Sequence, residues 1–276
     1  MLPYWKSVII ILTLLAVQAM CDLALPSYTS DIIDVGIQNS GVEHVVPEKI
    51  TEEELQTAQF IMTDDEADVW KSLYKEKDGY YELKNLSEDK LNQADEELTV
   101  PLIMNYQMST MEVDAFKKSI AAQMGMDAAQ LADMSVEQIG QMMHMELESF
   151  MQEKEDDDGN TKTVECVDVR SVFSALLQSG AMTKDQIFSM RDDMEDTIDA
   201  IGSSLVKSMG VAYAASADKA AGVDIDQVQK DYLWMSGLKM VGMALLMGVV
   251  TVLVGFFASR VGAGVGRDLR DKVFKR

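Results

Sequence analysis

The sequence predicts an all-α membrane protein in which two transmembrane helices flank a mostly helical extracytoplasmic domain. Two uncharged apolar runs lie near the ends of the 276-residue chain, and acidic residues are concentrated between them. The second run, Met240–Ser259, would form a helix of about 30 Å, which matches the thickness of bilayer hydrocarbon. We therefore expect a first transmembrane helix with an external extension (residues 1–40), an acidic extracytoplasmic domain (41–229), and a second transmembrane helix with the start of a cytoplasmic helical extension (230–276).

Basic residues after the second run predict the orientation. They are Arg260, Arg267, Arg270, Lys272, Lys275 and Arg276, against only two acids, Asp268 and Asp271. Because basic flanks stay on the cytoplasmic side, the second helix is expected to run inward. The chain is then a multi-pass plasma-membrane protein with both termini cytoplasmic and about residues 40–229 extracytoplasmic.

The first run, Ser7–Cys21, is short for a span and could instead be the apolar core of a secretory signal. Three features favour a retained helix. The residues Gln18–Met20 lack the small residue expected just before a cleavage or lipidation point. Apolar character continues as Leu23–Leu25, and Tyr4–Trp5 is typical of a membrane interface.

Gln18 and Asp22 are the candidate functional residues of the first span. They are four residues apart and share one face of a helix. An ionisable group this close to hydrocarbon is expected to face a partner helix or a wet cavity. The alternative is that Asp22 already lies at headgroup depth.

The acidic middle limits the partners that the chain can have. The formal net charge is −22, and almost all acids lie between the two apolar runs. A nucleic-acid partner is excluded because a phosphate-binding surface must be basic, so the acids are interpreted as a solvated surface. The two cysteines, Cys21 and Cys166, are not expected to form a disulfide, and no Cys/His cluster has zinc spacing.

Capping motifs and apolar stripes predict the helices of the middle. A Ser, Thr or Asp is followed three residues later by Glu or Gln at Thr51 with Glu54, Ser135 with Gln138, Thr183 with Gln186, and Asp224 with Gln227. Apolar residues at helical spacing follow the second and third motifs, over Val136–Phe150 and Ile187–Met209. Asp78-Gly79 predicts a tight hairpin turn.

Four stretches have features of a binding site, but each is better explained as structural. Gly262–Gly266 lacks the ending of a phosphate loop, so its small residues are expected to admit a neighbouring helix. Lys154–Glu165 resembles a calcium loop, but Lys154 occupies the place of the first carboxylate. Met142–Met145 and Met124–Met126 could ligate copper(I), although core filling explains them. No catalytic, cofactor-binding or metal-ligating residue is therefore expected, and the chain is not expected to be an enzyme.

Two stretches resemble one family. Asp22–Ile37, with Pro26, Asp31, Asp34 and Gly36, resembles the end of the first transmembrane helix in the permease domain of bacterial ABC exporters. Ser259–Phe274, with Arg260, Arg267 and Arg270, resembles the inner half of the second helix. The acidic middle is longer than the first external loop usual in that family.

The resemblance implies the N-terminal part of a half-transporter. Such a subunit acts with a second half-transporter, identical or different, in the lipid bilayer. ATP and magnesium would bind a nucleotide-binding domain that this chain lacks, so the chain is expected to be a fragment. Arg260–Phe274 would supply part of the rigid lever between ATPase and membrane.

Two other classes share the topology. A two-span receptor would bind a ligand with its extracytoplasmic domain and signal through the second helix. A membrane-tethered binding module is the third reading, with methionine-rich helices as its only indication.

Overall fold

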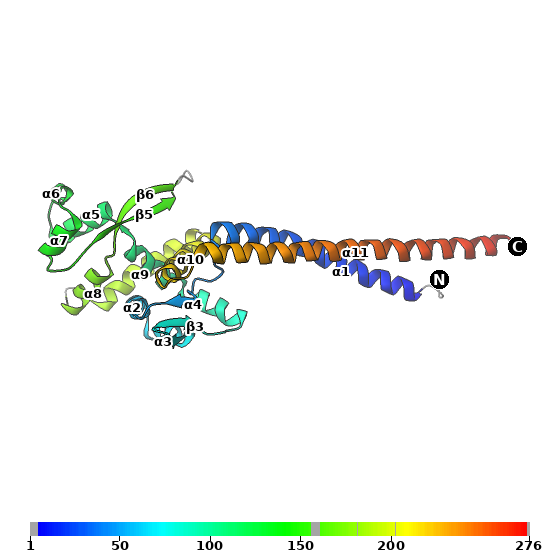
Figure 1. Cartoon of the computed structure of the whole chain (residues 1–276), viewed down its shortest axis with the longest axis horizontal. Coiled ribbons are helices and arrows are strands. Elements are labelled where there is room, and N and C mark those ends of the chain that lie inside the picture. Colours follow the sequence, from blue (N-terminus) through cyan, green and yellow to red (C-terminus); the bar gives the residue numbers. More distant parts are fainter. Residues whose placement is uncertain (1–4, 156–160, 181, 202, 275–276) are drawn as a thin grey trace. The chain divides into compact units, whose positions relative to one another are not determined.

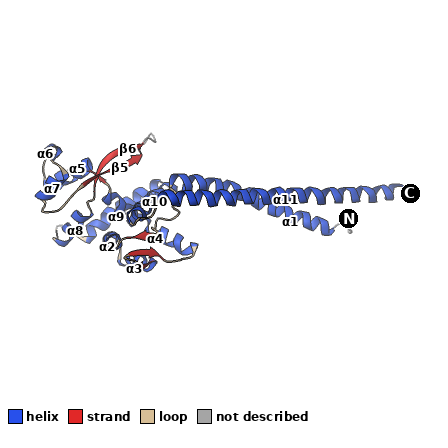
Figure 2. Cartoon of the chain, in the orientation of Figure 1, coloured by secondary structure: helices blue, strands red, loops and turns tan. Residues whose placement is uncertain are grey.

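The computed structural model describes residues 5–155, 161–180, 182–201 and 203–274. Its contacts divide the chain into two units, Met1–Val42 with Ile225–Arg276, and Glu43–Asp224. Helices dominate both, in agreement with the all-α class, and two small sheets also occur (Figure 2).

The first unit is an antiparallel pair of long helices (Figure 1). Helix α1 (Trp5–Asp31) continues without a break into the π-helix η2 (Ile32–Gln38), and α11 (Ile225–Phe274) packs beside them. Both helices are long and apolar enough to cross a membrane. Only 6% of the most apolar window of each is buried, whereas the core helix of a soluble domain would be covered. The two ends of the chain thus provide two candidate membrane spans.

A narrow stripe joins these helices. The covered positions of α1 alternate in steps of three and four residues and include Ile11, Leu14, Gln18, Cys21, Leu25 and Tyr28. This spacing is that of a coiled-coil seam, which buries one stripe and leaves the other faces open. On α11, Ser236 and Val250 are buried.

The second unit begins with a small sheet and three short helical segments. These elements are β1 (Lys49–Ile50), α2 (Glu52–Thr57), η3 (Ala58–Ile61), α3 (Asp64–Leu73), β2 (Tyr74–Lys77) and β3 (Tyr80–Leu83). The strands form an antiparallel sheet in the order β1-β3-β2, with Lys77 opposite Tyr80. Asp78 and Gly79 have φ values of 53° and 80°, so the predicted hairpin turn is confirmed.

The remainder of the unit surrounds the long helix α4. Its elements are α4 (Glu88–Ser109), β4 (Met111–Glu112), α5 (Val113–Met124), α6 (Ala128–Ala132), α7 (Val136–Met142), β5 (Ser149–Glu155), β6 (Thr161–Val167), α8 (Arg170–Gln178), α9 (Lys184–Ile201) and α10 (Ser203–Ala220). Strands β4, β6 and β5 form a second antiparallel sheet in that order. A core that includes Phe116, Leu131 and Ile139 holds α5, α6 and α7 together.

The predicted helix over Val136–Phe150 is wrong in its second half. Helix α7 ends at Met142, and the chain enters strand β5 at Ser149. His144 has a left-handed φ of 57°, and the amide of Met145 donates to the carbonyl oxygen of Gly140, which closes the helix. The apolar spacing continues beyond the end of α7 because Leu147, although it lies in the following loop, is also buried in the core.

The single stripe predicted over Ile187–Met209 belongs to two helices, since α9 ends at Ile201 and α10 begins at Ser203. Ile187 is buried, but Met190 and Leu205 are exposed, and the side chains of Ile198 and Ile201 lie outside the described ones. The stripe is therefore only partly covered.

The predicted starts of three helices, α7, α9 and α11, are confirmed. Ser135 and Gln138 form a reciprocal capping box, and Thr183 exchanges hydrogen bonds with Gln186 in the same way. Helix α11 begins directly after Asp224, as expected. Of the calcium-loop candidate, Asp156, Asp158 and Gly159 lie outside the described residues, and the flanking residues form the β5–β6 hairpin.

Candidate functional site

The structure separates the two candidate residues of the first span. Gln18 is half-covered and lies three residues before Cys21, whose side chain is 2% exposed in the seam with α11. Asp22 is exposed. Gln18 therefore belongs to the helix contact, whereas Asp22, one turn further on, is not covered by it.

The predicted motif after Asp22 forms the π-helix and its contact with α11. Pro26 lies inside α1, and Asp31 is its last residue; both are exposed. Asp34 accepts a hydrogen bond from the Ser30 hydroxyl at 2.9 Å. This local bond holds the carboxylate within its own turn of helix.

The close approach of α11 explains why the motif has a glycine at position 36. A Cβ there would lie 2.5 Å from Cδ2 of Leu233, and the Gln229 side-chain amide donates to the Gly36 carbonyl at 2.8 Å. The last carbonyls of a helix have no partner within the helix, and Gln229 satisfies the one at Gly36. Gly36 thus allows η2 and α11 to approach closely enough for a direct bond.

The basic residues of the second motif lie on the last turns of α11. Arg260, Arg267 and Arg270 are exposed, and an Nη2 atom of Arg267 lies 3.6 Å from the Asp268 carboxylate. Helix α11 is unbroken through Gly262–Gly266, so this segment is not a phosphate-binding loop.

A charge cluster that sequence reasoning missed lies in the second unit. The Arg170 guanidinium, at the start of α8, donates to Glu54 at 2.8 Å and to Asp168 at 2.7 Å. The amide of Asn105 and the hydroxyl of Tyr213 also donate to Glu54, at 2.8 and 3.0 Å. Four elements, α2, α4, α8 and α10, therefore meet at one carboxylate.

Glu54 is also the third helical residue of a predicted capping box. Thr51 accepts from its backbone N–H, but the Glu54 side chain turns away to Arg170 instead of returning to Thr51. The largely covered guanidinium of Arg170 offers a stronger, charge-assisted bond than one backbone amide. Burial opposes the charge of Arg170, but Asp168 and Glu54 outweigh it and raise its pKa.

A second cluster of this kind links α3 and α9. The carboxylate of Glu66 accepts two hydrogen bonds from Arg191, at 2.6 and 2.5 Å. Although burial acts to raise it, the bonds from Arg191 and Thr63 lower the pKa of Glu66. The sequence signal was present, since Thr63 and Glu66 form a reciprocal capping box.

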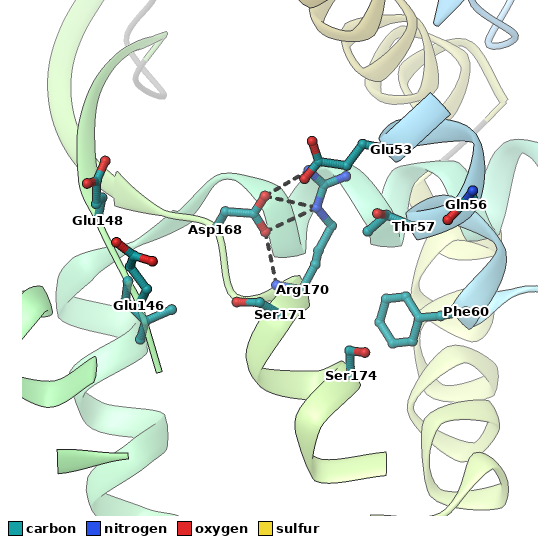
Figure 3. Close-up of a pocket in the computed structure, with 11 residues that line it drawn as sticks. Glu53, Gln56, Thr57, Phe60, Glu146, Glu148, Asp168, Arg170, Ser171 and Ser174 are labelled. Atoms are coloured by element: carbon teal, nitrogen blue, oxygen red, sulfur yellow. Dashed lines mark hydrogen bonds and ion pairs between the residues drawn. The ribbon is translucent and has the colours of Figure 1, made fainter. Parts of the chain in front are cut away.

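An open pocket of about 740 Å³ lies beside Arg170 (Figure 3). Glu53 and Phe60, from α2 and η3, form one wall, and Ser171 and Ser174 of α8 line it below Arg170. The opposite wall carries acidic side chains, Glu146 and Glu148.

The pocket lining is suited to binding more than to catalysis. Arg170 is already bonded to two carboxylates, whereas Glu53, Glu146 and Glu148 make no ion pair with any described residue. Their charge favours a cationic or hydrogen-bond-donating molecule. Within the described part of the chain, no three His, Cys, Asp or Glu side chains are placed to hold a metal ion.

The histidines lie elsewhere. His44 Nδ1 lies 2.9 Å from the Asp95 carboxylate, and His144 is exposed on the loop after α7. In neither place does the structure describe a serine or cysteine bonded to the ring.

Comparison with known proteins adds no identity to these observations: no protein-family model, curated protein or solved structure matches this chain.

Proposed function

We propose that the chain forms the first two spans and the enlarged first external domain of an ATP-driven exporter of the ABC type. The observation that carries the proposal is the length and continuity of α11, which has 50 residues. At about 1.5 Å per residue such a helix is about 75 Å long, more than twice the hydrocarbon thickness. Its apolar stretch, Met240–Ser259, would cross the bilayer, and Arg260–Phe274 would project into the cytoplasm as a rigid lever.

The contact between η2 and α11 supports the same proposal. Gly36 and Gln229 join the outer ends of the two spans by a direct hydrogen bond. A pair fastened at one end can transmit a rotation of its other end, as alternating access requires. In this proposal Gln18 braces the pair, and exposed Asp22 faces a further helix or an aqueous pathway.

In such an exporter, ATP is hydrolysed by another part of the complete protein. Nucleotide and magnesium would bind domains beyond this chain, in a dimer of half-transporters within the plasma membrane. Closure of those domains would act on the lever Arg260–Phe274. This segment supplies the mechanical connection and no catalytic group.

A two-span receptor is the second candidate, and the pocket beside Arg170 favours it. A cavity of about 740 Å³ is large enough for a small molecule and lies in the proposed extracytoplasmic domain. A receptor commonly interrupts its cytoplasmic helix with a connector, whereas α11 continues through its glycine-rich segment to Phe274. This continuity favours the lever.

The reading frame downstream of the codon for Arg276 separates the two candidates. Four further apolar spans followed by a Gly-x-x-x-x-Gly-Lys-Ser/Thr loop support the exporter. A relay helix followed by a kinase or a coiled coil would support the receptor and contradict the exporter.

Topology is tested with single introduced cysteines in intact cells. Met151 is 66% exposed on β5, and Asp271 is exposed near the end of α11. A membrane-impermeant maleimide is expected to label Met151→Cys in intact cells and Asp271→Cys only after permeabilisation. The native Cys21 and Cys166 are buried, so the unmodified chain is the background control. Labelling in the reverse order would overturn the proposed orientation.

A further inference from the structure

The segment His44–Lys49 follows directly on the boundary between the two units and lies entirely within the second. We call it the strap. Before β1 it has no helix or strand of its own, yet Val45 and Val46 are buried. A Cβ on Gly210 of α10 would lie 2.5 Å from Val45 Cγ1, so this glycine provides the space into which the strap packs.

Asp95 of α4 holds the start of the strap with both carboxylate oxygens. One accepts the Val45 N–H at 2.9 Å, and the other lies 2.9 Å from Nδ1 of His44. The charged groups around the imidazole are Asp95, Glu88 at 3.7 Å, and Lys207, which itself lies 3.5 Å from Asp95. The hydrogen bond to Asp95 and the charges of Asp95 and Glu88 outweigh burial and Lys207, and they raise the pKa of His44.

Asp218 of α10 holds the end of the strap, and it is only 2% exposed. Its carboxylate accepts the Lys49 N–H at 2.7 Å. The Lys49 ammonium lies 3.9 Å from the centre of the Tyr80 ring, and no described cation forms an ion pair with Asp218. Burial and the charge of Glu48 outweigh backbone hydrogen bonds and raise the pKa of Asp218 from 3.8 to about 7.

A third hydrogen bond holds the middle of the strap. The buried hydroxyl of Tyr74 donates to the Pro47 carbonyl at 2.9 Å, and the Tyr74 ring lies 4.9 Å from that of Trp70. The charge of Asp218 also acts on Tyr74, whose hydroxyl remains neutral because burial raises its pKa well above 10. The strap is thus fastened to α4, α10 and the residue that begins β2.

We propose that His44–Lys49 is a proton-dependent strap: proton uptake by His44 and Asp218 holds it against α4 and α10, and proton loss loosens it. The two groups have opposite charge types but act in the same direction. Protonated His44 attracts Asp95 and Glu88, and this attraction is lost as pH rises through its raised pKa. Neutral Asp218 is compatible with its buried site, whereas the ionised carboxylate gains hydration if the strap opens.

The raised pKa of Asp218 determines the pH range over which the strap opens. A carboxyl with a raised pKa in the closed state makes opening easier as pH rises from its ordinary value to about 7, by at most about tenfold per pH unit. His44 extends the effect above 6.5, because its pKa in the closed strap exceeds that value. Opening is therefore expected to increase steadily between pH 5.5 and 8.

Hydrogen exchange of the full chain in lipid nanodiscs tests the strap. After correction for the intrinsic pH dependence of exchange, protection of the Val45 and Lys49 amides is expected to fall by about tenfold or more between pH 5.5 and 8. Amides inside α4, such as that of Leu102, should keep their protection. Protection of the strap that is constant, or that rises with pH, would overturn the proposal.

Asp218→Asn supplies the matched variant, because its amide keeps a neutral acceptor for Lys49. Between pH 5.5 and 8 its Lys49 amide is expected to lose less protection than the wild-type amide, and the remaining loss, above pH 6.5, is expected to come from His44. Asp133→Asn, at an exposed aspartate, should retain the wild-type pH dependence. If Asp218→Asn also retained it, Asp218 would not be the proton-binding group.

Fluorescence gives a second measurement that does not depend on Asp218→Asn. With Trp5→Phe and Trp234→Phe, Trp70 is the single tryptophan, and it contacts the strap through Tyr74. Its emission is expected to change with pH between 5.5 and 8. An emission spectrum unchanged over this range would contradict strap opening.

Discussion

Replacement of Gly41 by alanine tests the close approach of the turn after η2 to the main chain of α11. Gly41 has a φ of +81°, and a Cβ there would lie 2.7 Å from Cα of Gln229 on α11. Two costs therefore combine, a left-handed backbone with a side chain and a collision with main-chain atoms that cannot rotate away. Gly222 provides the matched control, because its φ is +85° but a Cβ would meet nothing within 4 Å.

The magnitude follows from these two terms. Backbone strain at a left-handed position costs about 1–3 kcal/mol for a residue other than glycine. Overpacking adds about 1–3 kcal/mol for Gly41→Ala alone. Gly222→Ala should therefore show only the first cost, and the difference of about 1–3 kcal/mol corresponds to about 5- to 150-fold in the opening equilibrium of the pair.

Cys21 makes this opening measurable. Its thiol is buried in the seam between α1 and α11, so it reacts with a maleimide only when the helices separate. With Cys166→Ser as background, Cys21 is the single thiol. In detergent, Cys21 is expected to be labelled about 5- to 150-fold faster in Gly41→Ala than in Gly222→Ala.

Equal labelling rates in the two variants would refute this reasoning. So would a Gly41→Ala protein that labels as slowly as the parent, since the pair would then tolerate the added methyl group.

Two predictions concern the second unit. Arg170→Met leaves the largely covered carboxylate of Glu54 without its cation, so the free energy of unfolding should fall by about 3–5 kcal/mol, measured by denaturant titration of the full chain. Lys77→Met, at an exposed ion pair, should change it little, and equal effects would contradict a structural role for Arg170. Glu66 has a lowered pKa, so its bond to Arg191 stabilises the fold above the ordinary value of 4.5 and is lost as pH falls through the lowered value. In Glu66→Gln, the free energy of unfolding should fall less steeply as pH drops below 4.5, because the titrating carboxyl is gone. An acid transition identical to that of the wild type would contradict this role of Glu66.

Local signals in the sequence are reliable where one turn of helix decides the structure. Ser135 with Gln138 predicted the start of α7, and Asp78-Gly79 predicted a hairpin turn. Each depends on atoms only a few residues apart, so the rest of the fold hardly affects it. The end of α7 was missed because a left-handed histidine, His144, carries no strong sequence signal.

The strands β1 and β4 were missed for another reason. Strands β1 and β4 are two residues long and pair with β3 and β6, which lie far along the chain. Segments this short have no periodicity to detect, and their pairing exists only once the partner strand is in place.

The sequence by itself determined which two segments are apolar enough to cross a bilayer, where acids and bases accumulate, and where α2, α7, α9 and α11 begin. These properties follow from composition and from neighbours along the chain. The tertiary structure alone decided which face of α1 carries Gln18 against α11, and that Glu54 binds an arginine 116 residues away. Contacts of this kind depend on packing between distant segments, and desolvation, which strengthens a buried ion pair and raises the pKa of Asp218, appears only when those segments meet.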